Sequence, residues 1–386
     1  MFMSSLSVWS LGRWMESLAL GWLVLQLTNS PFMLGAVTAA RVGPHLLAPL
    51  GGTVADRMDR GRLLGLAQAG QAAISLVIGV LVVTDRVHVW QLLVLMAVAG
   101  TANSFAQPTR QTLVYDLAGK SNLVVGNALM RAAIRASFMV GSPLAGFIVA
   151  RWGVAPCLFL VAALDLGGAA LSFLIRAGNR TSASNTESFR ANLTEAVRFV
   201  RGQPAILALL TLEITYDMFV VPYHTLMPVF ARDVLKVGPT GLGLLLGASG
   251  AGSLVGALGM ATIRSPARKG ALLLGSYVVL GAVLLAFSLS PWYYLSLLLL
   301  VGVGMLDSVA MTLLPALIQT ASPEAMRGRV MGLYVFTWAA VPVGSLQAGA
   351  VASFMGAPFA VGLSGVLVAL YVAGIARRAL RVRAWD

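Results

Sequence analysis

The segment "GGTVADRMDRGRLL" (Gly51–Leu64) carries five charged residues in a chain of which only 11% of the residues are charged. The 50 residues before it are mostly apolar, and Gly65–Thr84, which follows it, contains no charged residue. A short charged segment between two long apolar ones is typical of a loop that joins two helices in a lipid bilayer. The rest of the chain therefore has to be read for further bilayer-spanning segments.

Long uncharged runs establish that the chain is a membrane protein. Gly241–Thr262, Ala271–Leu306 and Val330–Ala376 contain 22, 36 and 47 consecutive residues without a charge, and 58% of all residues are hydrophobic. A bilayer core of ~30 Å needs roughly 20 apolar residues per helix. The two longer runs therefore hold two spans each. This pattern predicts an all-α polytopic membrane protein, since one soluble core could not bury so much apolar sequence.

The apolar segments divide the chain into two halves of six helices each. The first half is expected at residues 1–176 and the second at 204–386, joined by a cytoplasmic linker at 177–203. The end of this linker has a short amphipathic pattern, with apolar residues on one face and arginines elsewhere. The twelve transmembrane helices are expected near residues 3–27, 31–51, 63–84, 88–107, 122–150, 154–176, 204–230, 239–262, 270–289, 292–319, 329–354 and 357–377.

The basic residues set the orientation of these helices. Of the 23 Lys and Arg residues outside the expected spans, 19 lie in the even-numbered loops and the C-terminal tail, and only four lie in the odd-numbered loops. The positive-inside rule then places both termini and the linker in the cytoplasm. The net charge of +13 is explained by this asymmetry, so no nucleic-acid partner is expected.

The two halves have related sequences. One offset pairs Pro31 with Pro239 and Gly35 with Gly243, and a slightly smaller one pairs Gly100 with Gly304. "AGFIVARWG" (145–153) also matches "AGAVASFMG" (348–356). Three matches in the same order at nearly one offset indicate an internal duplication. Two parallel six-helix repeats are the plan of a secondary transporter that rocks about a central site.

Several motifs resemble the major facilitator superfamily. The pattern G-x-x-x-D-R-x-x-R begins at Gly52, and the segments "YHTLMPVFARDVLKVGPTGLGLL" and "SPEAMRGRVMGLY" resemble the branch of enterobactin-type siderophore exporters and macrolide-efflux-like proteins. The chain departs from the family pattern at Asp59, where glycine is usual, and at Gly61, where a basic residue is usual. The resemblance implies the major facilitator fold in a bacterial inner membrane, with a small-molecule substrate moved by alternating access.

The resemblance also implies a cytoplasmic gate in the opening segment, formed by Gly52, Asp56, Arg57 and Arg60. Asp56 would sit at the positive N-terminal end of a helix in the other half, and the arginines would pair with nearby acids such as Asp116. The glycine would let two helices approach closely. The alternative is that these charges only solvate a loop and fix its topology.

Charged residues inside the expected helices are candidates for function, because a charge at the bilayer centre costs from about 3 to more than 10 kcal/mol. The first half places arginines in its helices, whereas the second half places acids there without a base. The resemblance puts helices 1, 4, 7 and 10 around the transport cavity. We therefore predict Glu16, Glu213, Asp217 and Asp307 as proton-coupling carboxylates, and Arg13, Arg41, Arg131 and Arg135 as basic residues of the substrate cavity.

Other roles for these charges stay open. Arg13 and Glu16 could form a local pair on one helix, and Asp165 could bond to a neighbouring helix. A basic wall that faces an acidic wall suits a charged or zwitterionic substrate, or ion pairs between the halves that break during transport. The segment "GSPLAGFIVARWG" (141–153) loosely resembles the glycine- and proline-rich helix 5 motif of drug antiporters.

The sequence gives no sign of an enzyme or of a bound cofactor. A single cysteine, Cys157, excludes a disulfide framework, and the three histidines are spread over separate segments. No nucleotide-binding G-x-x-x-x-G-K-[ST] motif and no H-E-x-x-H metal motif occur. The energy for transport is therefore expected from an ion gradient.

These observations predict a monomeric, proton-coupled exporter of a small amphiphilic molecule, either drug-like or siderophore-like. An importer on the same fold is one alternative, because the fold does not fix the direction of transport. A membrane signalling or scaffold protein without transport is the other. The charges kept inside the bilayer argue against the second alternative.

The topology can be tested by cysteine accessibility in a Cys157→Ala background. Ser184→Cys, in the linker, is expected to stay unlabelled by a membrane-impermeant thiol reagent in intact cells, because the linker faces the cytoplasm. Arg86→Cys, in an odd-numbered loop, is the control and is expected to label. Labelling of Ser184→Cys in intact cells would reverse the assignment.

Overall fold

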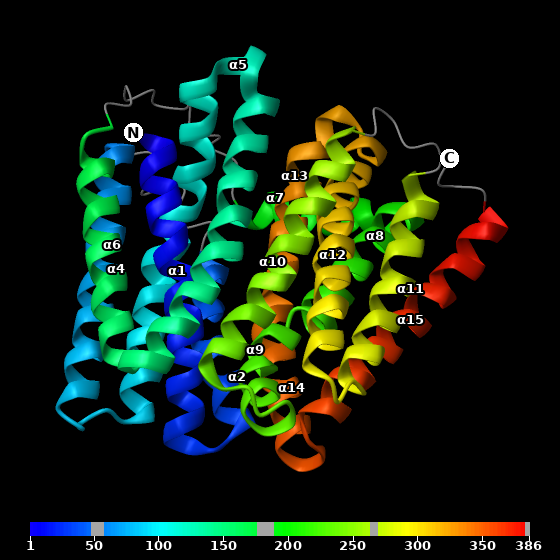
Figure 1. Cartoon of the computed structure of the whole chain (residues 1–386). Helices are drawn as coiled ribbons and strands as arrows, with labels where there is room; N and C mark the ends of the chain where they lie inside the picture. The colour runs from blue at the N-terminus through cyan, green and yellow to red at the C-terminus, as the bar shows by residue number, and fades with distance from the viewer. Residues whose placement is uncertain (48–57, 176–188, 263–268, 383–386) are drawn as a thin grey trace.

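The computed structural model describes residues 1–47, 58–175, 189–262 and 269–382, and almost all of them are helical. The N-terminus and the end of the last helix lie at the same end of the molecule (Figure 1). The first set of helices is α1 (Phe2–Thr28), α2 (Pro31–Val42), η1 (Gly43–Leu47), α4 (Arg60–Val83), α5 (Val89–Trp152) and α6 (Val154–Phe173). The second set is α7 (Phe189–Arg201), α8 (Pro204–Thr215), η2 (Tyr216–Val220), α9 (Tyr223–Val229), η3 (Phe230–Val234), α10 (Gly238–Thr262), α11 (Lys269–Ser288), α12 (Tyr293–Ala321), α13 (Glu324–Phe336), η4 (Thr337–Ala339), α14 (Ala340–Met355) and α15 (Ala357–Val382).

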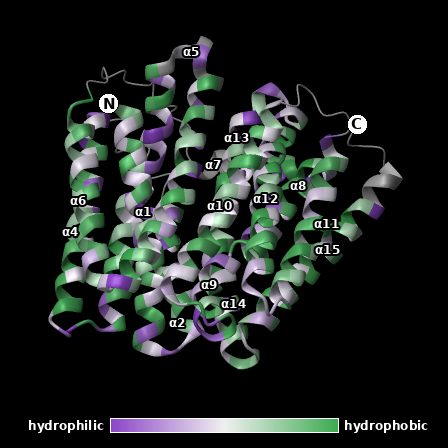
Figure 2. Cartoon of the chain, in the orientation of Figure 1, coloured by the Kyte–Doolittle hydropathy of each residue, from purple (hydrophilic) through white to green (hydrophobic). Residues whose placement is uncertain are grey.

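Within these residues, ten helical segments are long and apolar enough to cross a membrane. Hydrophobic residues cover the helices along most of their length (Figure 2), and large apolar side chains such as Val80 and Leu298 are exposed where lipid would contact them. The all-helical, multi-pass class is thereby confirmed. The first two of the twelve expected spans correspond to α1, which carries Arg13 and Glu16, and to α2, which is described only to Val42 before the 3₁₀ turn η1.

The expected end of the fourth helix was too early. A loop was expected from residue 108 to 121, but α5 consists of two helices that meet at a kink at Gly119, where φ is 70°, and their membrane-spanning segments are Val89–Leu117 and Val125–Trp152. Pro108 does not end the helix. Proline is tolerated in membrane helices because neighbouring helices, hydroxyl side chains and local adjustments compensate for the lost backbone hydrogen bond. The consequence is that Arg110 lies within a helix.

The helices pack in two groups. α1, α2, α4, α5 and α6 contact one another, and α10, α11, α12, α14 and α15 form a second set of contacts together with α8 and η2. The two groups stand side by side in Figure 1. Contact between them is made mainly by α5 with α10 and by α2 with α14, while α9 adds contacts to α1 and α2. We call these two main contacts the α5–α10 seam and the α2–α14 seam.

The α2–α14 seam depends on two glycines that lie against backbone carbonyl groups. A side chain at Gly35 of α2 would clash with the carbonyl oxygen of Ser345 on α14. In the reverse direction, a side chain at Gly349 of α14 would clash with the carbonyl oxygen of Pro31 on α2. The two backbones therefore approach as closely as helices can, which is the usual role of glycine in membrane helix packing.

The α5–α10 seam has the same construction. A side chain at Gly243 of α10 would clash with the carbonyl oxygen of Ser142 on α5, and one at Gly146 of α5 would clash with the carbonyl oxygen of Pro239 on α10. The offset that pairs Pro31 with Pro239 also pairs Gly35 with Gly243. The match between residues 145–153 and 348–356 likewise aligns Gly146, the seam glycine of α5, with Gly349, the seam glycine of α14.

A third pair of contacts follows the same alignment within each group. Gly100 of α5 lies against the carbonyl oxygen of Arg41 on α2, and Gly304 of α12 lies against the carbonyl oxygen of Ser249 on α10. The smaller offset aligns Gly100 with Gly304, and the offset that pairs Pro31 with Pro239 aligns Arg41 with Ser249. The sequence matches thus coincide with matching backbone contacts.

The seam contacts predict a large effect from one methyl group. A Cβ at Gly243 would lie 2.6 Å from the Ser142 carbonyl oxygen and 3.0 Å from the Pro143 Cα. Backbone atoms cannot rotate away, so Gly243→Ala is expected to lower stability by roughly 1–3 kcal/mol through overpacking. Thermal unfolding of the purified protein measures this loss. Gly275→Ala on α11, which meets nothing within 4 Å, is the control and should unfold at or slightly above the wild-type temperature. Equal unfolding temperatures for Gly243→Ala and wild type would contradict the packing.

Candidate functional site

Glu16 is the centre of a buried network in the first helix group. Its side chain is fully buried, and its Oε2 lies 2.6 Å from Nη2 of Arg41 on α2. From α4, Gln71 Nε2 and the Ser75 hydroxyl donate to Oε1 at 2.6 and 3.4 Å. Glu16 therefore pairs with Arg41 rather than with Arg13, its neighbour on the same helix. The network joins α1, α2 and α4, and it unites one predicted carboxylate with one predicted base.

Arg135 and Asp307 form an ion pair between the two helix groups. Nη2 of Arg135 on α5 lies 3.2 Å from Oδ2 of Asp307 on α12, and Nη1 of Arg135 donates to the Ser253 hydroxyl on α10 at 3.3 Å. The other carboxylate oxygen of Asp307 accepts a hydrogen bond from the Tyr216 hydroxyl. Arg135 of the first group is thus held by two side chains of the second, Asp307 and Ser253, next to the α5–α10 seam.

Glu213 and Asp217 lie where an α-helix changes into a π-helix. Glu213 is near the end of α8, and Asp217 is in η2, a five-residue π-helical segment; such segments often occur at functional sites. Each side chain is only 2% exposed. Tyr334 lies near Glu213, and Thr337 lies near Asp217. One oxygen of each carboxylate has no hydrogen-bond partner in the part of the chain that the structure describes.

The remaining predicted residues are not brought to these clusters. Arg131 is exposed on α5. Of the predicted gate, Gly52, Asp56 and Arg57 lie outside the described residues. Arg60, the first residue of α4, forms an ion pair with Asp116 of α5; this is the acid that the sequence suggested as its partner.

Sequence reasoning missed a basic cluster around Trp9. Arg110, counted as a loop residue, is only 7% exposed, and its guanidinium carbon lies 3.4 Å from the centre of the Trp9 ring. Arg13 lies over the same ring at 5.5 Å. Nη1 of Arg110 donates to Asn103 Oδ1 at 3.1 Å. The spacing of seven residues between Asn103 and Arg110, two turns of one helix face, was the available signal, but the helix was expected to end at residue 107.

Asp165 is a second unexpected feature of this region. It is 1% exposed on α6, and among the described residues neither carboxylate oxygen has a hydrogen-bond partner. Its Oδ1 would lie 3.5 Å from a Cβ at Gly12, so α1 and α6 approach closely there. Arg13 and Arg110 are within electrostatic range of it. Within the described ranges, the hydrogen bond to a neighbouring helix that the sequence suggested is not formed.

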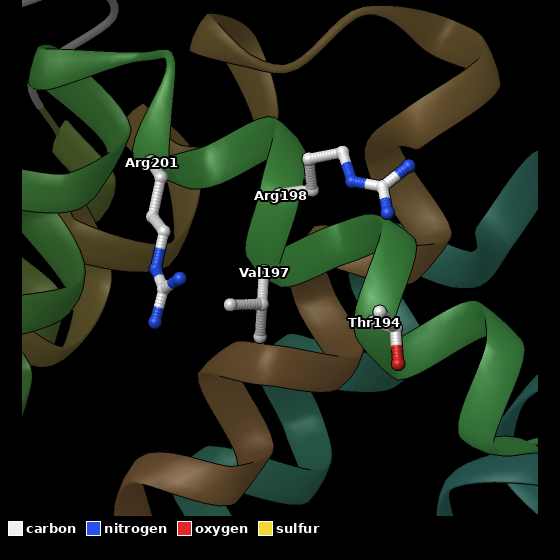
Figure 3. Close-up of a pocket in the computed structure, with 4 residues that line it drawn as sticks. All are labelled: Thr194, Val197, Arg198 and Arg201. Carbon is white, nitrogen blue, oxygen red and sulfur yellow. The ribbon is translucent and has the colours of Figure 1, made fainter.

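A surface cavity lies on α7, apart from these charges. It has a volume of about 440 Å³ and is lined by Thr194, Val197, Arg198 and Arg201 (Figure 3). The helix is amphipathic, with Ala196 and Val200 buried, and Glu195 forms an ion pair of 3.1 Å with Arg329 of α13. The described residues include no group of three His, Cys, Asp or Glu side chains that could hold a metal ion.

Known proteins resemble the chain over most of its length. The multidrug efflux pump Tap of Mycolicibacterium fortuitum is 27% identical over 360 residues, which cover 89% of this chain and 87% of Tap. The enterobactin exporter EntS of Shigella flexneri is 26% identical over 318 residues, 81% of this chain and 74% of EntS. A bacterial homolog of the human lysosomal transporter Spinster, in an inward-facing and occupied conformation, has the same fold, with a TM-score of 0.78 at 12% identity over 100% of this chain and 97% of that one.

The sequence profile of one transporter family matches the chain from end to end. This profile, described as "Transmembrane secretion effector", covers residues 2–386. The match confirms the resemblance seen in the motifs, and the relatives are transporters rather than enzymes. The chain belongs to the transmembrane secretion effector family of the major facilitator superfamily.

Proposed function

We propose that this protein is a proton-coupled exporter of a small amphiphilic molecule in the bacterial inner membrane. Relatives named as a multidrug efflux pump and an enterobactin exporter support the outward direction. The observation that carries the proposed coupling is the buried pair Glu213 and Asp217, each with an unpartnered oxygen. An ionised carboxylate buried without a counter-ion costs several kcal/mol, so a proton is the simplest ligand for this pair.

The proposed architecture is the major facilitator plan of twelve transmembrane helices. Residues 1–176 and 204–386 would form two six-helix bundles related by duplication, with 177–203 as the linker. The paired backbone contacts of the two seams support this division, because the alignment of the halves pairs the contacting residues of one seam with those of the other. In this scheme the protein acts as a monomer with both termini in the cytoplasm.

Alternating access would proceed by breaking and remaking the seams. The glycine contacts lie where α2 begins and α14 ends, and where α10 begins; the loop charges assign this end to the outer side. The described conformation would therefore be closed to the outside. The gate residues Gly52, Asp56, Arg57 and Arg60 would close the opposite, cytoplasmic side in the alternate state.

The interbundle ion pair offers a physical link between rocking and protonation. Tyr216 bonds to Asp307 and directly precedes Asp217 in η2. When the bundles separate, the Arg135–Asp307 pair would have to break, and Asp307 would lose its counter-ion while it still accepts the hydrogen bond from Tyr216 of η2. The environment of Asp217 would then change with the conformation, as a proton-driven exporter requires.

The coupling site can be tested in proteoliposomes with an imposed pH gradient and an internal pH dye. A panel of amphiphilic drugs is added, and substrate-dependent proton movement is measured. Asp217→Asn is expected to abolish proton movement and pH-driven accumulation while retaining substrate exchange, because no proton can be bound there. Glu213→Gln is expected to reduce both in part.

Asp85→Asn, an exposed acid between α4 and α5, is the matched control and should behave as wild type. If both neutral variants still accumulate substrate against its gradient, coupling resides elsewhere, and Glu16 and Asp307 become the next candidates.

The gate can be tested by Asp56→Asn. A loop carboxylate contributes little to stability, whereas a carboxylate at a helix terminus biases one state by about 0.3–2 kcal/mol. Transport is expected to fall severalfold while membrane insertion and thermal unfolding stay unchanged, as monitored on the same vesicles. Wild-type transport together with unchanged cysteine accessibility on both sides would show that this segment is only a solvated turn and not a gate.

A further inference from the structure

We propose that Arg13 and Arg110, arranged around Trp9, form a binding site for the carboxylate group of an aromatic or otherwise apolar molecule. This inference rests on the proposed transport function and names the chemical class of its substrate: an amphiphilic organic acid.

The spacing of the two arginines suits one carboxylate. Their guanidinium carbons lie 3.4 and 5.5 Å from the same Trp9 ring centre, so they are at most about 9 Å apart. A carboxylate carbon lies about 4 Å from the guanidinium carbon to which it is hydrogen-bonded. The separations that these distances allow include those at which one carboxylate accepts hydrogen bonds from both side chains.

Arg110 is fixed in place by a directed chain of hydrogen bonds. Its Nη1 donates to Asn103 Oδ1, and Asn103 Nδ2 lies 3.0 Å from His45 Nε2. The other ring nitrogen of His45, Nδ1, lies 3.0 Å from the Val42 carbonyl oxygen. Nδ1 donates to that carbonyl, and Nε2 accepts from the Asn103 amide nitrogen, an arrangement that requires the neutral ring. The chain uses one of the five N–H donors of Arg110 and orients the guanidinium, which lowers the cost of binding a ligand.

Neither arginine has a carboxylate partner of its own. In the described ranges, no acid lies within 4.0 Å of Arg13 or Arg110, because Glu16 is taken by Arg41. Asp165 acts on both arginines electrostatically but bonds to neither. Burying guanidinium groups without a counter-ion is unfavourable. A ligand carboxylate would supply the missing charge and would be held by charge-assisted hydrogen bonds.

The exposure of the three side chains indicates how a ligand enters. Arg110 is buried at the back of the cluster, whereas Trp9 and Arg13, one turn apart on α1, are partly exposed. A ligand would thus approach from the Arg13 side with its carboxylate leading. Its apolar body would remain near the indole, whose ring accepts stacking contacts.

The test is equilibrium binding to the purified full chain in phosphatidylcholine nanodiscs, measured by calorimetry without any gradient. The probes are benzoate, naphthoate and biphenylcarboxylate, each paired with its uncharged primary amide. At least one acid is expected to bind about tenfold or more tightly than its amide, because the amide lacks the charge-assisted bonds. Arg13→Gln and Arg110→Gln are each expected to remove this preference, whereas Arg13→Lys should retain it.

Arg86→Gln, an exposed arginine between α4 and α5, is the control and should bind like wild type. If Arg110→Gln does not fold, the binding preference of Arg13→Gln, a substitution at a partly exposed residue, is the test of the site. The site is overturned if no acid is preferred over its amide, or if the preference survives in folded Arg13→Gln. Because the assay needs no transport, acid-selective binding without export would refute only the proposed function, and export without acid-selective binding would refute only this site.

Discussion

The close approach of glycine to backbone carbonyl groups at the two seams is the constraint on which the rest of the structure depends. At Gly35 and Gly243 no side chain fits, so α2 packs on α14 and α5 packs on α10 more closely than residues with side chains at these positions would allow. Arg135 lies two turns before Ser142 on α5, roughly 10 Å along the helix. Its reach to Asp307 in the other group therefore depends on the α5–α10 seam being closed.

The buried charges fall into two kinds, and the difference matters for function. Glu16 with Arg41, and Asp307 with Arg135, have found partners, so their desolvation is at least partly offset. Glu213, Asp217 and Asp165 each keep oxygens without a partner within the described residues. Partnered charges join helices or bundles, whereas unpartnered ones in a membrane mark the places where a proton or a ligand is expected to bind.

Composition and periodicity were enough to predict the class of fold, because uncharged runs of 22 to 47 residues have no other stable arrangement. The motif near Gly52 and the matches between the halves led to the family. The partner of Arg60 was predicted as Asp116, but the partner of Glu16 was not, since Glu16 had an arginine nearby on its own helix and yet pairs with one on α2. Arg110 was misplaced because the fourth helix was expected to end at residue 107, whereas the structure accommodates Pro108 inside a membrane helix. The π-helical geometry at Asp217 left no signal in the residue pattern.

The central claim is that the two seams are equivalent and open together when the outer side opens. It can be measured by the distance between spin labels on two pairs of exposed residues at the seam ends, Phe32 with Phe354 and Arg151 with Thr240, in nanodiscs over a range of pH. We expect both distances to lengthen in parallel as one pH-dependent transition, and this transition to be lost in Asp217→Asn. Distances that stay fixed at every pH, or a change at one seam without the other, would contradict the account.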